Sequence, residues 1–131
     1  MMEVRDLAFV MHAAVETAAA ISFIVQPEQQ LPGCTPAAKL ILRQYGGLLL
    51  ASSMICMIVV ASPGCSANAT RLLAAALGSY HVWPCFRASA RLRHQAQYDT
   101  HENSVFGGPL VHLLVHSVCL GLFLYAAIAQ T

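Results

Sequence analysis

Four long apolar runs constrain this chain more than any other feature of its sequence. They cover about residues 7–26, 38–61, 69–88 and 108–128 of a chain of 131 residues. Each is close to the roughly 20 residues that an α-helix needs to cross the hydrocarbon core of a bilayer. Only 10% of the residues are charged, whereas a soluble domain carries about 25%. The sequence therefore predicts an all-α, four-helix transmembrane bundle, surrounded by the lipid bilayer and forming one integral-membrane domain over residues 1–131.

Helix-breaking residues separate these runs. Pro27, Pro32 and Gly33 follow the first run, and Ser62-Pro63-Gly64 follows the second. Proline removes a backbone N–H and glycine favours non-helical conformations, so both residue types are expected to end a helix. The fourth run opens with Gly107-Gly108-Pro109, where proline is tolerated in the first helical turn.

The third run contains a proline and ends in polar sequence. Pro84 cannot donate a hydrogen bond to the carbonyl of Tyr80, so we expect a kink there. Residues 87–104 form the longest polar stretch of the chain. We expect its first part, through about His94, to extend the helix into water.

Ionisable side chains recur inside the apolar runs. Glu16 lies near the middle of the first, His81 lies in the third, and His112 and His116 lie in the fourth. Charged groups at this depth are costly unless they are paired, neutral or in a polar cavity. His12 and Glu16 are four residues apart, as are His112 and His116, so each pair shares one helix face. We expect these faces to turn toward a common interior rather than toward lipid.

Such an interior predicts acid–base chemistry. A buried carboxyl group can hold or take a proton near neutral pH, and imidazoles at similar depth can relay it. We therefore assign Glu16, His81 and His116 as catalytic residues that act on a lipophilic small molecule without a cofactor or a bound metal. The residues expected to bind and orient that substrate are spread over all four runs and are His12, Gln44, Tyr45, Tyr80, Trp83 and His112.

Other interpretations of these residues stay open. Histidines four residues apart can bind one metal ion, so His112 and His116, with His81, His12 and Glu16, could form the metal or haem site of an oxidoreductase. The polar groups could instead hold helices together in a non-catalytic helper or transporter subunit. Small residues within the runs allow close helix approach, which also leaves homo-oligomers open.

The distribution of basic residues sets the expected orientation. In a four-span chain, the loop before the second run and the loop after the third lie on the same side. The basic residues near those loops are Lys39, Arg43, Arg87, Arg91 and Arg93, against Arg5 and Arg71 on the opposite side. The positive-inside rule then places both termini outside the cytoplasm, in a lumen if the chain is eukaryotic. The net charge of +1 and the lack of a basic block give no indication of nucleic-acid binding.

A resemblance to known proteins rests on three segments of the chain. They read GGLLLASSMICMIVV, ALGSYHVWPCFRASARLR and GGPLVHLLVHSVCLGLFLYAA. With their Tyr-His and His-x3-His patterns, they resemble small four-span membrane proteins of filamentous fungi, some of which accompany secondary-metabolite pathways. The architecture is also similar to that of DoxX-like proteins. The resemblance implies an endoplasmic-reticulum enzyme that acts on a lipophilic polyketide or terpenoid, as a cyclase, isomerase or epoxide hydrolase.

Overall fold

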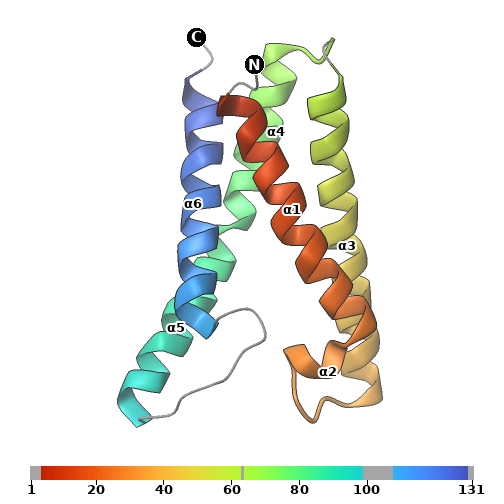
Figure 1. The fold of residues 1–131 in the computed structure, drawn as a ribbon, viewed down its shortest axis with the longest axis vertical. Coiled ribbons are helices and arrows are strands. Elements are labelled where there is room, and N and C mark those ends of the chain that lie inside the picture. The colour runs from red at the N-terminus through yellow and green to blue at the C-terminus, as the bar shows by residue number, and fades with distance from the viewer. Residues whose placement is uncertain (1–3, 63, 99–107, 130–131) are drawn as a thin grey trace. The chain divides into compact units, whose positions relative to one another are not determined.

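The computed structural model describes residues 4–62, 64–98 and 108–129, and the regular elements in them are helices (Figure 1). Pro63 and residues 99–104 of the polar stretch lie outside the described residues. In chain order the helices are α1 (Val4–Val25), α2 (Pro27–Gln30), α3 (Pro36–Ala61), α4 (Ala67–Tyr80), α5 (Val82–Tyr98) and α6 (Gly108–Ile128). They fall into two compact units, the first over Met1–Cys65 and the second over Ser66–Thr131. The all-helical class is therefore confirmed.

Three helices are long and apolar enough to cross a membrane, namely α1 (over Arg5–Val25), α3 and α6. Large apolar side chains are exposed along them, including Leu40 and Ile41 on α3, both 65% exposed, and Leu114 on α6, 57% exposed. Such surfaces suit lipid rather than water. The chain is therefore an integral-membrane protein, as its sequence predicts.

The third apolar run, residues 69–88, forms two helices rather than one. Helix α4 ends at Tyr80 after 14 residues, and α5 begins at Val82 and has 17. Neither reaches the roughly 20 residues that a spanning helix needs, so this run is not among the candidate spans. The polar continuation is helical as predicted, but it reaches Tyr98 rather than about His94.

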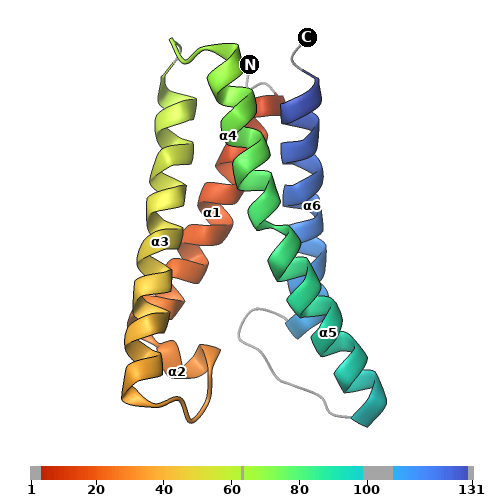
Figure 2. The ribbon, with the colours of Figure 1, turned by 180° about the vertical axis from the view of Figure 1, so that it is seen from behind.

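Pro84 explains the interruption. Because proline has no N–H, Pro84 cannot bond the carbonyl of Tyr80 one turn earlier. At the junction, the N–H of His81 donates to the carbonyl of Gly78, three residues back, at 3.0 Å, which is the tighter 3₁₀ pattern. His81 keeps helical backbone angles (φ −67°, ψ −14°), so α5 continues in the general direction of α4 (Figure 2).

Helices α1 and α3 form the antiparallel hairpin of the first unit, joined through the short helix α2 (Figure 1). Their buried positions recur at alternating steps of three and four residues, the spacing that keeps one face against a neighbouring helix. On α1 one such series is Phe9, Ala13, Glu16, Ala20 and Phe23, and on α3 the series is Gly46, Leu49, Ser53 and Cys56. The α1 series is apolar near its ends and carries Glu16 in its middle, and His12 is buried one turn before Glu16.

Polar contacts fix the turn of this hairpin. Lys39, in the second turn of α3, donates a hydrogen bond to the carboxylate of Glu28 on α2. This contact holds the pKa of the Glu28 carboxyl below its usual range. Gln30 Nε2 also donates to Ser22 Oγ at 2.7 Å, which ties α2 back to the last turns of α1.

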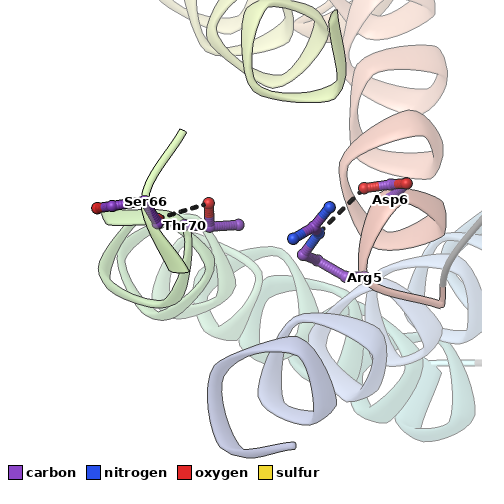
Figure 3. A network of polar contacts seen from close by, with 4 residues as sticks. All are labelled: Arg5, Asp6, Ser66 and Thr70. Carbon is purple, nitrogen blue, oxygen red and sulfur yellow. Dashed lines mark hydrogen bonds and ion pairs between the residues drawn. The ribbon is translucent and has the colours of Figure 1, made fainter. Parts of the chain in front are cut away.

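Local contacts also occur in the first turns of α1 and α4 (Figure 3). Arg5 Nε donates to Asp6 Oδ1 at 3.1 Å. Ser66 caps α4, because its Oγ accepts the N–H of Ala69 at 3.2 Å and its carbonyl accepts the hydroxyl of Thr70 at 3.1 Å. The cap satisfies a backbone donor that the helix itself cannot pair.

The second unit pairs α6 with α4 and α5 together (Figure 2). Near the end of α6, Arg71 Nε on α4 donates to the carbonyl of Ala127 at 3.1 Å. Nearer its start, Ser117 Oγ lies 3.6 Å from Cys85 Sγ on α5. The two contacts fix an antiparallel register in which α4 lies against the second half of α6 and α5 against the first.

We expect Gly46→Ala to make the first unit less stable than Gly47→Ala does. A Cβ at Gly46 would lie 2.8 Å from Ile24 Cγ1 and 3.0 Å from the carbonyl oxygen of Ala20, whereas one at Gly47 meets nothing within 4 Å. Both substitutions gain the same helix propensity, so the difference isolates overpacking, which costs about 1–3 kcal/mol.

The measurement is an SDS titration in mixed micelles, read as thiol labelling of buried Cys56 and resolved by mass spectrometry. Gly46→Ala should unfold at a lower SDS fraction than Gly47→Ala. Equal midpoints would show that α1 and α3 do not pack closely at Gly46.

Candidate functional site

A buried pair of histidines lies in the second unit, where α4 passes into α5. His81 is fully buried and His116, on α6, is 3% exposed. Their Nδ1 atoms are 2.8 Å apart, which is hydrogen-bond distance. A hydrogen bond between two ring nitrogens needs one donor and one acceptor, so one ring carries a proton on Nδ1 and the other does not. The two rings therefore share one proton.

This shared proton gives the two Nε2 atoms opposite roles. In the neutral state, the ring that donates through Nδ1 has an unprotonated Nε2, and the ring that accepts has an Nε2–H. The pair thus presents one base and one acid at once. Neutral rings also avoid the cost of burying an imidazolium.

Aromatic rings hold the imidazoles of this pair in place. Phe123, one heptad after His116 on α6, stacks on His81 with ring centroids 5.7 Å apart and planes inclined by 25°. The ring of Tyr80 lies edge-on to His81 at 5.2 Å and to His116 at 6.4 Å. His112, half-buried, lies edge-on to His116 at 4.3 Å. Four of the predicted site residues, His81, His116, His112 and Tyr80, therefore do form one cluster.

The spacing within the pair fits a direct hydrogen bond better than a shared metal ion. Two imidazole nitrogens that bind one tetrahedral zinc at about 2.0–2.1 Å stand about 3.4 Å apart. The Nδ1 atoms of His81 and His116 are closer than that, at 2.8 Å. A metal held by His81, His116 and His112 would require the pair to separate.

A second polar cluster lies in the first unit, between α1 and α3. His12 is 1% exposed, and its Nε2 lies 3.0 Å from Ser52 Oγ. The hydroxyl of Ser52 donates to the carbonyl of Leu49 at 2.7 Å. Since a hydroxyl has one hydrogen, His12 must donate its Nε2–H to the Ser52 oxygen. The contact therefore fixes the tautomer of a neutral His12.

Glu16 lies one turn after His12 and is also 1% exposed. The prediction that the two share a buried face of α1 is therefore confirmed. Glu16 belongs to the series of α1 positions that are buried in the first unit, and it lies near the middle of a candidate span, at the depth where charge is most costly.

The other predicted substrate-binding residues do not join these clusters. Tyr45 packs edge-on against Phe23 with ring centroids 5.0 Å apart, as a packing residue of the α1–α3 seam. Gln44 is exposed rather than turned inward, and Trp83 is 72% exposed. Depth along a helix does not determine which way a side chain points, so the binding role of these three residues stays a prediction.

The predicted catalytic set divides between the two units. Glu16 belongs to the first, and His81 and His116 belong to the second. Their convergence on one substrate stays a prediction, whereas the His81–His116 contact is a property of the second unit itself.

Sequence reasoning missed two residues of these clusters. Ser52, the partner of His12, lies in an apolar run, and only the antiparallel register of α1 and α3 places it opposite His12. Phe123 follows His116 by seven residues, a spacing that keeps both on one helix face. That spacing was the available signal for Phe123.

Comparison with known proteins gives no relative of this chain. No protein-family model, no curated protein and no solved structure matches it. The functional argument therefore rests on the chemistry and geometry of its own residues.

We expect the two histidines of the pair to be coupled in stability. Replacing one, in His81→Phe or His116→Phe, leaves the buried Nδ1 of the other without its partner, which costs about 1–3 kcal/mol. The double variant removes both polar groups and should cost less than the sum of the single variants. SDS titration of the three variants measures the loss of unfolding free energy in each. If the loss in the double variant equals the sum of the two single losses, the result would contradict a direct hydrogen bond between His81 and His116.

Proposed function

We propose that this protein is an integral-membrane enzyme that performs acid–base chemistry on a lipophilic substrate. The observation that carries the proposal is the buried Nδ1–Nδ1 contact of His81 and His116 at 2.8 Å. The substrate class is a polyketide or terpenoid intermediate of secondary metabolism. The reaction is a cyclisation, an isomerisation or an epoxide opening, none of which needs a redox cofactor.

The pair accounts for proton transfer without a buried net charge. The unprotonated Nε2 takes a proton from a carbon or hydroxyl group of the substrate, while the opposite Nε2–H gives one to a second substrate atom. The Nδ1 proton then crosses from the first ring to the second, and both rings are neutral again with their roles exchanged. Because no charged ring persists, the cycle suits a site of low dielectric constant.

Neighbouring groups have supporting roles in this proposal. Tyr80 and His112 lie beside the pair, where a phenol can orient a substrate oxygen and an imidazole can exchange protons with His116. Glu16 is a second proton-transfer group, which a conservative substitution tests separately. No cofactor is needed for the proton transfers described.

We further propose that α4 and α5 together make a fourth crossing. Helices α4 and α5 lie against α6 from Ala127 to at least Ser117, and α6 is a candidate span. A broken helix within the membrane is tolerated where neighbouring helices pair its backbone. With four crossings, the bias of basic residues favours termini outside the cytoplasm, in the lumen of the endoplasmic reticulum that the resemblance implies.

We expect His81→Asn and His116→Asn to abolish turnover in a host that makes the substrate. General acid–base catalysis contributes about 10²–10⁴-fold, so the unprocessed lipophilic intermediate should accumulate. Metabolite profiling at matched protein levels measures this, with Glu16→Gln assayed alongside. His94→Asn, at an exposed position of α5, is the matched control and should leave metabolites unchanged.

Unchanged metabolites in both pair variants, at normal protein levels, would contradict the enzymatic proposal. That outcome would favour a helper subunit whose histidines only hold helices together. Turnover lost in Glu16→Gln alone would move the catalytic assignment to the first unit.

A further inference from the structure

Three imidazole rings form a series in the second unit. His112 is four residues after Gly108, the first residue of α6, and His116 is four residues further on. At 1.5 Å per residue, they lie about 6 Å and about 12 Å from that end of the helix. His81 lies beside His116 at hydrogen-bond distance. Because α6 is a candidate span, the series leads from one end of the span toward its centre.

Burial increases along this series. His112 is half-buried, His116 is 3% exposed and His81 is fully buried. The ring of His112 lies edge-on to that of His116, with centroids 4.3 Å apart, and the Nδ1 atoms of His116 and His81 are 2.8 Å apart. Adjacent rings are therefore close enough to pass a proton directly or through one water molecule. Chains of histidine side chains are one form of proton relay within membranes.

His112 is better suited to exchange protons with the pair than the other groups beside it. Tyr80 lies edge-on to both rings of the pair, but a phenol ordinarily ionises only at about pH 10. Arg87 and Arg91 on α5 interact electrostatically with His112, but a guanidinium group keeps its proton. An imidazole takes and gives protons near neutral pH.

We propose that His112 passes protons between the His81–His116 pair and water at the end of the membrane where α6 begins. Nδ1 of His116 is engaged with His81, so a proton enters or leaves the His116 ring through Nε2. A proton that His112 takes from water moves to an unprotonated Nε2 of His116, and the Nδ1 proton of that ring then moves to His81. The pair has then gained one proton, His112 is neutral again, and the reverse steps return a proton to water. The inference goes beyond the proposed function, because it concerns the proton supply of the pair with or without a substrate.

The rate at which the pair gains and loses a proton tests this route. Protein that carries nitrogen-labelled histidine, in phosphatidylcholine bilayers, is brought to the pH at which the pair is half protonated. Nitrogen relaxation dispersion of His81 and His116 then gives the exchange rate, without any substrate. His112→Gln keeps a polar side chain but cannot relay a proton near neutral pH. We expect its exchange rate, at its own midpoint pH, to fall about a hundredfold, the low end of what a positioned acid–base group contributes.

Two further variants separate proton relay from packing. His112→Ala leaves space at that position, so imidazole added to the buffer should restore most of the rate. The same imidazole should do little for His112→Gln, whose amide fills the space. Tyr80→Phe is the matched control, because it removes the phenol beside the pair and keeps the ring. It should keep the full exchange rate.

Three results would overturn the proposal. An unchanged rate in His112→Gln would show that protons reach the pair by another route. A slowed rate in His112→Ala that imidazole does not restore would show that His112 only packs against the pair. Loss of the Nδ1–Nδ1 correlation of the pair in both His112 variants would likewise assign His112 a positioning role. Since the exchange needs no turnover, these results are distinguishable from failure of the enzymatic proposal.

Discussion

The hydrogen bond between His81 and His116 is the interaction on which the second unit depends. It forms because Pro84 interrupts the helix just where His81 lies and because α6 runs antiparallel to both fragments. Gly78 permits the approach, since a Cβ there would lie 2.9 Å from Cβ of Phe123. Phe123 in turn stacks on His81. The helix break near Pro84, the close packing at Gly78 and the stacked ring of Phe123 therefore all hold His81 in position for its hydrogen bond to His116.

The first unit handles a buried histidine in a different way. His12 donates to a serine whose own proton goes to the backbone, so its tautomer is fixed. In the His81–His116 pair the Nδ1 proton can reside on either ring. This difference is why the pair is the better candidate for proton transfer and His12 the better candidate for a structural group. Glu16 is also a candidate for proton transfer, because it is an ionisable group buried near the middle of a candidate span.

Much of the secondary structure was predictable from the sequence, and much of the site was not. Apolar length gave α6 at its observed bounds, residues 108–128, and α1 and α3 within a few residues, because the hydrophobic requirement of a bilayer sets helix length. Apolar length was not sufficient for residues 69–88, which form two shorter helices because Pro84 cannot donate a hydrogen bond to the carbonyl of Tyr80. Four-residue spacing correctly paired His12 with Glu16 and His112 with His116. Gln44 and Trp83 are exposed in the structure, since helix rotation is set by packing that a single sequence does not show, and their role in substrate binding stays a prediction.

Nitrogen NMR of the histidines in bilayers tests the central claim most directly. We predict two hydrogen-bonded neutral rings, one protonated at Nδ1 and the other at Nε2, with a correlation between their Nδ1 nuclei. His116→Phe should remove that correlation and change the signals of His81, whereas His94→Asn should leave both rings as they are. Two imidazoles that both carry Nδ1 protons, or that show no correlation between their Nδ1 nuclei, would contradict a proton shared between His81 and His116.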